Sequence, residues 1–343
     1  MDCIFLSHGL MIEKSSLHDC CYIREMTKGR PLIMPLNQDK TVDWKEFFEL
    51  KSKQKNEKIN SEQACKDCIY LHKDWDLNHE GSYVSVFQIA HWNKCNSNCI
   101  YCSPENNSGD KYFNCFELIK SLFEYEGGAY IKDCNHVSFL GGEPTLLPEF
   151  EDLISLFVSK NFKIIIHSSG IKFSETIYKY LPSGQLRVVI SPDSAFENTY
   201  KKIKRVDCFD KVWENLRKYV SVQKNSDNVK VKFIIVPGIN DSFEEVDCFL
   251  DKVKEIGASY VIWDIEGFYS SKNNYFAPHI QMLLQYAAAK TQEYKMQYEF
   301  YSIAQKFLKS LNVVFDEIED LQKFKSGFYS LKEKYKHNNI QYL

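Results

Sequence analysis

The 343-residue chain has little net charge, no long apolar run and no internal repeat of fixed period. Its formal net charge is −3, with lysines and acids interspersed, which argues against binding to nucleic acid or to a charged membrane surface. No segment approaches the roughly 20 apolar residues needed to cross a bilayer. The first residues lack the basic and apolar regions of a secretory signal, so we expect a cytoplasmic protein.

Cysteine, by contrast, is plentiful. In an oxidising compartment the twelve cysteines would be expected to form disulfides. Their clustering as C-x2-C and C-x3-C-x2-C instead indicates metal ligation in a reducing compartment. The cysteines that stand singly within helix or strand patterns are interpreted as small buried hydrophobic residues: Cys115, Cys134, Cys208 and Cys248.

The motif of most chemical interest contains Cys95, Cys99 and Cys102 on one short segment. Three thiolates together form a soft site that suits iron or zinc. A 4Fe-4S cluster held by three cysteines leaves one iron without a protein ligand, and a small molecule can take that open position. The alternative is a structural zinc knuckle made of the three cysteines and His91, although zinc ligands usually come as two C-x2-C pairs.

A second motif follows an apolar strand over Val137 to Leu140 and comprises Gly141, Gly142, Glu143 and Pro144. The glycines allow the backbone to approach a ligand closely, and the proline stiffens the turn. The glutamate offers an anionic acceptor for an ammonium group. The alternative is an ordinary turn between a strand and a helix.

Together the two motifs, with Tyr101 just before the third cysteine, resemble the radical S-adenosylmethionine (SAM) superfamily. The resemblance implies that SAM chelates the open iron and that the turn at Glu143 holds the SAM amino group. It implies an electron from a flavodoxin or ferredoxin, cleavage of SAM to a 5′-deoxyadenosyl radical, and abstraction of a substrate hydrogen. The substrate could be a peptide or a sugar-type metabolite, and the net reaction an oxidation. The alternative from another class is a non-enzymatic, zinc-stapled binding module.

Strand-length apolar runs alternate with helical patterns over residues 79–277. The predicted strands are Val84–Ala90, Val137–Leu140, Lys163–Ile166, Leu186–Ile190, Val231–Val236 and Tyr260–Ile265. Continuous apolar strands with crossover helices indicate an α/β fold with a parallel sheet. Six units fit the partial (β/α)6 TIM-like barrel of the superfamily, and an open doubly wound sheet is the alternative from the pattern alone.

Ligand-binding groups of such a barrel gather at the carboxyl ends of its strands. Ser168 and Ser169 follow the third predicted strand and could bond a ribose or cap a helix. Ser191 and Asp193 follow the fourth and match the Ser-x-Asp of the family, whose aspartate could reach the ribose or sulfonium side of SAM. Asp264 and Glu266 lie at the end of the sixth strand and share its inward parity, so they are candidate substrate contacts or proton acceptors.

Residues 1–78 form a predicted small domain with a metal centre of its own. A hairpin around Ser7 to Gly9 and a helix from Trp44 to about Lys55 are predicted there. The segment resembles the twitch or SPASM-type accessory domains, here placed before the barrel. The resemblance implies a second, auxiliary 4Fe-4S cluster on Cys3, Cys20 (or its neighbour Cys21), Cys65 and Cys68. The hairpin departs from the family pattern at Phe5-Leu6 and Asp19, and a zinc staple is the alternative.

Residues 278–343 are predicted to form a helical extension, with a long amphipathic helix from Pro278 to about Leu311. Such an extension could close the open side of the barrel or bind a partner.

Overall fold

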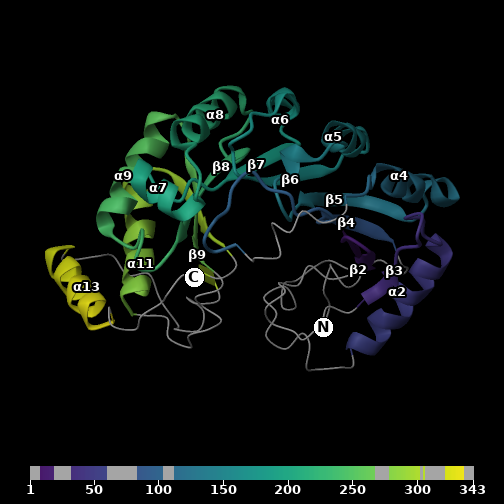
Figure 1. Ribbon diagram of the computed structural model, residues 1–343, viewed down its shortest axis with the longest axis horizontal. Coiled ribbons are helices and arrows are strands. Elements are labelled where there is room, and N and C mark those ends of the chain that lie inside the picture. Colours follow the sequence, from purple (N-terminus) through teal and green to yellow (C-terminus); the bar gives the residue numbers. More distant parts are fainter. Residues whose placement is uncertain are drawn as a thin grey trace. The chain divides into compact units, whose positions relative to one another are not determined.

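The computed structural model describes residues 8–18, 32–59, 83–102, 112–266, 278–301, 304–305 and 321–335. The chain divides into two compact units (Figure 1). Unit 1 comprises Met1–Cys95 and Pro104–His167, and unit 2 comprises Asn96–Ser103 and Ser168–Leu343. Each unit is described by itself.

Unit 1 is built on a mixed sheet with the strand order β6-β5-β4-β1-β2-β3. Its strands are β1 (Gly9–Ile12), β2 (Ser16–His18), β3 (Leu32–Pro35), β4 (Val84–Ile89), β5 (Ile131–Phe139) and β6 (Lys163–Ser168). The pairs β1–β4, β4–β5 and β5–β6 are parallel, whereas β1–β2 and β2–β3 are antiparallel. The three strands predicted here from apolar runs are therefore confirmed.

The helical elements of unit 1 are α2 (Trp44–Ile59), α4 (Phe116–Glu124), η2 (Tyr125–Gly128), η3 (Pro144–Leu146) and α5 (Phe150–Ser159). Figure 1 shows α4 and α5 on the same side of β4 and β5. Their apolar faces meet the sheet in an aromatic cluster, in which the ring of Phe87 on β4 lies 5.8 Å from Phe123 and 5.3 Å from Phe157. Both helices are amphipathic at the helical period, which is why one face of each is buried.

The described part of residues 1–78 joins this sheet. The second arm of the hairpin predicted around Ser7 to Gly9, residues 10–12, is part of β1, which pairs in antiparallel with β2. The predicted first arm, residues 3–6, lies outside the described residues, so that pairing stays a prediction. The predicted helix from Trp44 is formed as α2, and the Lys51 ammonium donates to the Gly9 carbonyl at 2.7 Å. Residues 60–82 lie outside the described part, so the predicted accessory-domain boundary at 78 stays a prediction.

Unit 2 contains a parallel sheet with the order β10-β9-β8-β7. Its strands are β7 (Leu186–Ile190), β8 (Val229–Ile235), β9 (Tyr260–Ile265) and β10 (Gln297–Phe300). Its helices are α6 (Glu175–Tyr180), η4 (Leu181–Ser183), α7 (Glu197–Lys204), α8 (Phe209–Val222), α9 (Phe243–Glu255), α11 (Pro278–Glu293) and α13 (Leu321–Tyr335). The fourth, fifth and sixth predicted strands are thereby confirmed.

Alternate residues of these strands face the helices. Phe233 on β8 and Trp263 on β9 are fully buried and contact Phe249 of α9, with ring centroids 4.9 and 5.8 Å away. The Trp263 indole N–H donates to Thr291 Oγ1 of α11 at 3.1 Å. Because side chains alternate along a strand, Lys232, Ile234 and Asp264 point to the opposite face of the sheet.

The carboxyl-terminal prediction is wrong in one respect. The helix beginning at Pro278 ends at Glu293, and Gln297–Phe300 forms β10, which pairs in parallel with β9. Lys295 has a positive φ of 58°, a left-handed conformation that does not continue a helix. The segment Gln-Tyr-Glu-Phe then alternates polar and aromatic residues at the period of a strand.

The strands of the two units and the helices that alternate with them establish an α/β fold that is rich in parallel strands and consistent with a radical SAM (β/α) barrel. Within the described residues, no helix is both long and apolar enough to span a membrane.

Candidate functional site

The cysteine segment follows β4 directly. Cys95 belongs to unit 1, whereas Cys99 and Cys102 belong to unit 2. Cys95 and Cys99 are half-buried and Cys102 is exposed. The Cys102 backbone N–H donates to the Cys99 carbonyl at 3.0 Å, which forms a tight turn between these two ligand positions. Cysteines on such a loop can reach a bound cluster without disturbing a helix or strand.

In unit 1 the Gly-Gly-Glu-Pro turn lies against the backbone that leads to Cys95. The Gly142 N–H donates to the Trp92 carbonyl at 3.2 Å, and the Glu143 N–H donates to the Lys94 carbonyl at 2.7 Å. A Cβ atom at position 142 would lie 2.1 Å from the Lys94 oxygen, so only glycine fits there. The close approach that the structure shows is to the backbone of residues 92–94, and the predicted approach to a ligand stays a prediction.

Glu143 is 2% exposed and is the N-cap residue of η3. Its Oε1 atom accepts the Thr145 N–H at 3.2 Å and the Thr145 hydroxyl at 2.6 Å. A carboxylate has lone pairs for further donors, so these bonds fix the orientation of Glu143 and leave it able to accept from an ammonium group.

In unit 2 Tyr101 and Asp193 meet, and Lys204 at the end of α7 joins them. The Tyr101 hydroxyl donates to Asp193 Oδ2 at 2.6 Å, and Lys204 donates to the Tyr101 oxygen at 2.5 Å and also to Asp193 Oδ2. The Lys204 ammonium also lies 5.0 Å from the centroid of the Tyr101 ring. Burial and the nearby Asp193 carboxylate raise the pKa of Tyr101, so its hydroxyl keeps its proton. This triad ties the segment that carries Cys99 and Cys102 to the end of β7.

Asp193 is fully buried and has a positive φ of 61°, a conformation that aspartate tolerates better than most residues. Its Oδ1 atom accepts the Ile234 N–H at 2.9 Å, and the Asn240 side chain donates to its carbonyl at 2.8 Å. Both carboxylate oxygens therefore have protein donors in this conformation. The predicted contact of Asp193 with SAM stays a prediction.

The three candidate serines lie at the starts of loops after β6 and β7. Ser168 Oγ accepts the Gly170 N–H at 3.0 Å, and Ser169 Oγ accepts the Ile171 N–H at 3.3 Å. Ser169 also donates to the Asn96 side chain at 2.8 Å, within unit 2. Ser191 is half-buried. Ser169 therefore contacts the cysteine segment, and the ribose contacts predicted for these serines stay predictions.

Asp264 and Glu266 are 4% and 2% exposed at the end of β9. Asp264 forms an ion pair with Lys232 of β8 at 2.7 Å and accepts the Ala304 N–H at 3.3 Å. The Lys232 ammonium lies 4.2 Å from the centroid of the Tyr301 ring. Asp264 is therefore paired with an ammonium on its own face of the sheet, and its predicted role as a substrate contact or proton acceptor stays a prediction.

The face of the unit 2 sheet that turns away from α9 carries charged pairs beside apolar residues such as Ile234 and Ile262. Lys230 of β8 donates to Glu299 of β10 at 3.0 Å, one pleat away from the pair of Lys232 and Asp264. Parallel sheets that are covered by helices on both faces carry apolar side chains on both. Charged pairs on this face instead fit the polar interior of a partial barrel in which a hydrophilic molecule could bind.

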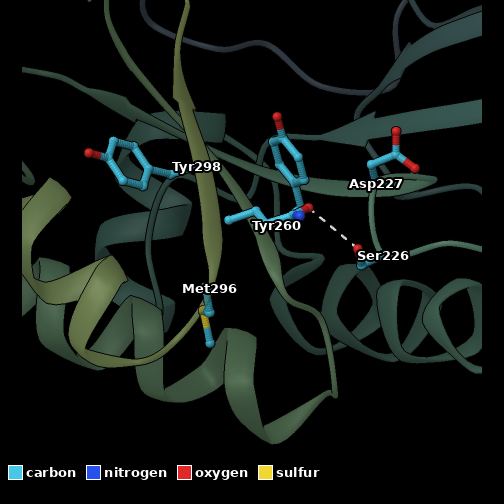
Figure 2. Close-up of a pocket in the computed structure, with 6 residues that line it drawn as sticks. Ser226, Asp227, Tyr260, Met296 and Tyr298 are labelled. Atoms are coloured by element: carbon cyan, nitrogen blue, oxygen red, sulfur yellow. Dashed lines mark hydrogen bonds between the residues drawn. The ribbon is translucent and has the colours of Figure 1, made fainter.

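A pocket of about 580 Å³ lies where β9 and β10 begin (Figure 2). It is lined by Ser226, Asp227, Tyr260, Met296, Gln297 and Tyr298. Ligand-binding groups of parallel α/β folds gather at the carboxyl ends of strands. This pocket lies at the amino ends, so it is not the predicted site.

Sequence reasoning missed Lys204, Lys232 and Asn240. Lys204 stands in a helix with Lys201 and Lys202, and nothing in the sequence separates it from solvated lysines. Lys232 did carry a signal, because a lysine inside an apolar strand needs a partner on its own face. The predicted auxiliary ligands Cys3, Cys20, Cys65 and Cys68, and the alternative Cys21, lie outside the described residues.

Residues 89–250 match the sequence model of the radical SAM superfamily, so the chain contains a radical SAM domain over this range. Membership of this superfamily implies a 4Fe-4S cluster and SAM. The matched range contains the cysteine motif, the Gly-Gly-Glu-Pro turn and the triad of Tyr101, Asp193 and Lys204.

Curated relatives include GTP 3′,8-cyclase of Clostridium botulinum, which is 26% identical over 181 residues, 52% of this chain and 56% of that protein. A probable GTP 3′,8-cyclase of Saccharolobus islandicus is 27% identical over 182 residues, 53% of this chain and 56% of that protein. The chain thus matches just over half the length of these relatives.

Among solved structures, Streptococcus suis SuiB bound to precursor peptide SuiA aligns with a TM-score of 0.54 and 13% identity. The alignment covers 80% of this chain and 67% of that chain. At this identity the likeness shows the fold alone.

Proposed function

We propose that this protein is a radical SAM enzyme that uses SAM to abstract a hydrogen atom from a polar substrate. The observation that carries the proposal is the clamp of the Gly-Gly-Glu-Pro turn on the cysteine segment, which lies within the superfamily match. When bound, the cluster and SAM supply reductive carbon–sulfur cleavage and a 5′-deoxyadenosyl radical. The electron would come from a flavodoxin or ferredoxin.

The residues present fit this pair of groups. Cys95, Cys99 and Cys102 offer three thiolates for a cluster whose fourth iron stays open. Glu143 is buried and already oriented by Thr145, so it can accept hydrogen bonds from the SAM ammonium. The turn at Gly142 packs against the backbone of Asn93 and Lys94, directly before Cys95.

The substrate proposed is a hydrophilic molecule. The charged pairs on one face of the unit 2 sheet support this class, because Lys232 and Asp264 are buried and paired with each other. The Asp264 carboxylate would bind a donor group of the substrate. Excluding water from this face would protect a radical intermediate.

A second candidate function is cyclisation of GTP. The identity to GTP 3′,8-cyclases favours it, but the alignment covers 56% of the Clostridium botulinum protein. The conserved radical chemistry and the choice of substrate can reside in different parts of a chain. Because the curated relatives are GTP 3′,8-cyclases, GTP is the first substrate to test, ahead of peptides and sugar-type metabolites.

We also propose that an auxiliary 4Fe-4S cluster on Cys3, Cys20, Cys65 and Cys68 accepts an electron from the substrate radical. Four cysteine ligands would leave no iron open for SAM, so this cluster would serve electron transfer or structure. A net two-electron oxidation would follow from that role.

The proposal is tested by reconstituting the protein anaerobically with iron and sulfide and adding dithionite and SAM, with or without GTP. We expect 5′-deoxyadenosine, and none from the Cys95→Ala variant. The Glu143→Ala variant should keep its iron while binding SAM more weakly. A protein that holds zinc without acid-labile sulfide would support the binding-module alternative and refute the enzyme.

A further inference from the structure

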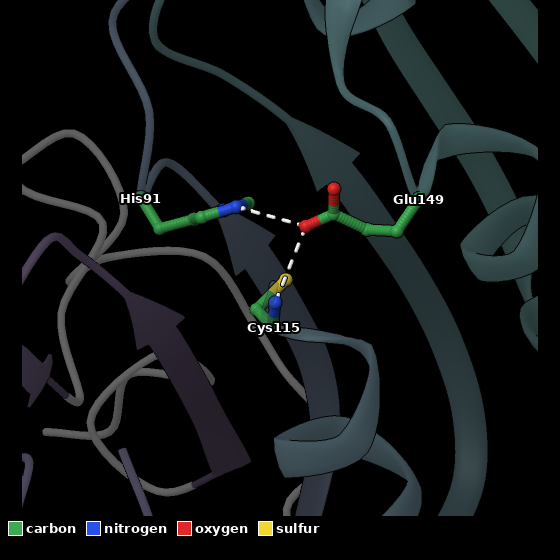
Figure 3. A group of neighbouring side chains, drawn as sticks. All are labelled: His91, Cys115 and Glu149. Carbon is green, nitrogen blue, oxygen red and sulfur yellow. Dashed lines mark hydrogen bonds and ion pairs between the residues drawn. The ribbon is translucent and has the colours of Figure 1, made fainter. Parts of the chain in front are cut away.

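Three side chains of unit 1 converge outside the cysteine motif: His91, Cys115 and Glu149 (Figure 3). The His91 Nε2 atom lies 3.1 Å from Glu149 Oε1. One donor atom from each residue, nitrogen, sulfur and oxygen, lies within 4.8 Å of the other two. Atoms bonded to one ion at about 2.0–2.3 Å lie within about 4.6 Å of one another, so an ion that contacts all three requires only a small closing of this spacing.

Each donor comes from a different element. His91 follows β4, Cys115 precedes α4, and Glu149 precedes α5. Ends of packed strands and helices hold side chains more firmly than long loops do. All three residues are buried, with exposed fractions of 1% for His91, 0% for Cys115 and 2% for Glu149. The arrangement is therefore formed in advance and shielded from bulk water.

The surroundings of Glu149 supply a second reason to expect an ion. Its carboxylate is buried, lies 3.1 Å from His91 Nε2 and accepts the Tyr112 hydroxyl at 2.5 Å. Among the described residues its only ion-pair partner is His91, and no lysine or arginine neutralises it. A buried carboxylate without a cation is costly, and a divalent ion would remove that cost.

We propose that His91, Cys115 and Glu149 bind one divalent metal ion of the zinc class, separate from the cluster on the cysteine motif. Imidazole, thiolate and carboxylate are the donors that zinc prefers. Binding releases the Cys115 thiol proton, and neutral His91 moves its remaining proton to Nδ1. Three protein ligands leave a fourth position for water or a small ligand.

Tyr112 completes the arrangement from the edge. Its hydroxyl donates to Glu149 Oε2 at 2.5 Å, which leaves Oε1 directed at His91 and Cys115. A hydrogen bond to the distal oxygen of a ligating carboxylate fixes the orientation of that carboxylate. It typically strengthens metal binding by about 10- to 100-fold, which corresponds to about 1.4–2.7 kcal/mol. Tyr112 is 36% exposed, so an ion would enter from this side.

The competing arrangement needs no ion. Protons on His91 Nε2, on the Cys115 thiol and on the Tyr112 hydroxyl would each donate to Glu149, and burial raises the pKa of Cys115 in that state. The two arrangements differ in one respect that can be measured: only the first takes up a metal that depends on Cys115.

The experiment uses the full chain with Cys95, Cys99 and Cys102 all changed to alanine, which removes the cluster ligands. Zinc per chain is measured by mass spectrometry after purification with zinc. The metal-free protein is then titrated with Co²⁺, and the thiolate-to-cobalt absorption is recorded. Adding Cys115→Ser should remove one equivalent of zinc and the corresponding part of the absorption. The matched control Cys248→Ser, a half-buried cysteine of α9, should change neither.

The chains with and without Cys115→Ser contain the same amino-terminal cysteines, so the difference in zinc and in absorption between them excludes any metal bound at those cysteines. Equal zinc and equal absorption with and without Cys115 would overturn the proposal. If Cys115→Ser fails to fold by circular dichroism, Tyr112→Phe keeps all three ligands and should weaken Co²⁺ binding about 10- to 100-fold. Anomalous diffraction at the zinc edge from the zinc-loaded chain decides independently, because a map without a peak among the three side chains would refute the site.

Discussion

Replacing Gly142 with alanine should damage the cluster site more than the same change at any other glycine in the described part of the chain. The new Cβ would lie 2.1 Å from the Lys94 oxygen, whereas ordinary contact begins near 3.4 Å. The turn and the cysteine segment must therefore separate by the difference, 3.4 minus 2.1, or about 1.3 Å. The obstacle is backbone, which cannot swing aside as a side chain can.

Such a separation breaks both backbone bonds of the clamp. The Glu143 bond to the Lys94 carbonyl is 2.7 Å long and would exceed hydrogen-bonding distance after the shift. Two lost bonds at about 0.5–1.5 kcal/mol each and overpacking of about 1–3 kcal/mol give a local cost of about 2–6 kcal/mol. A displacement of about 1 Å at a reacting group can lower a rate about 100-fold.

The assay compares iron per chain, the free energy of unfolding in urea, and the rate of 5′-deoxyadenosine formation. The control is Gly327→Ala in α13, where the new Cβ meets only Met282 Cε at 3.6 Å. That change should be neutral or stabilise the helix by about 0.5–1 kcal/mol. Gly142→Ala with the iron content and rate of the parent would refute the clamp.

Three further predictions concern other parts of the chain. Lys204→Met leaves the buried Asp193 carboxylate without its ammonium and should lower the free energy of unfolding in urea by about 3–5 kcal/mol. The control Arg217→Met breaks an exposed ion pair and should lower it by less than about 1 kcal/mol. Equal effects of the two changes would contradict the stabilising role given to the buried pair. Burial alone raises the pKa of Asp241, but His279 and Lys332 outweigh it and lower the pKa, so its stabilisation is present above about pH 4 and lost as the pH falls through the folded value. Urea unfolding at several pH values should show that dependence weakened in Asp241→Asn, and an unchanged slope would count against it. Cys65→Ala with Cys68→Ala should reduce iron from about eight to about four per chain while SAM cleavage continues, and unchanged iron would rule out the auxiliary cluster.

Six strands could be predicted from the sequence because each is a mostly apolar run of strand length, as in Leu186–Ile190 and Tyr260–Ile265. Such runs are buried regardless of which elements pack beside them, so the local sequence pattern is enough to predict a strand. The helix from Pro278 was predicted too long because its amphipathic spacing continues past Glu293. The alternating segment Gln297–Phe300 carried a strand signal, and pairing with β9 decides its conformation.

The residue types of the site could be predicted from the sequence, whereas the contacts between those residues could be predicted only in part. A glycine pair indicates close approach of the backbone, but only the fold shows that the neighbour of Gly142 is the Lys94 carbonyl. Tyr101 and Asp193 are 92 positions apart, yet they bond to each other directly, and Lys204 bonds to both. No local sequence pattern encodes these contacts. His91 was considered as a zinc ligand beside the three cysteines, and in unit 1 its Nε2 atom faces Glu149.

The central claim is that Cys95, Cys99 and Cys102 hold the cluster on which SAM is cleaved. It is tested most directly by measuring acid-labile sulfide and dithionite-dependent 5′-deoxyadenosine together in the chain with Cys65 and Cys68 changed to alanine, so that one cluster is counted. We expect about four irons, about four sulfides and 5′-deoxyadenosine, all abolished by further changing Cys95, Cys99 and Cys102 to alanine. SAM cleavage at the same rate in that last chain, or zinc in place of iron and sulfide in the first, would contradict the account.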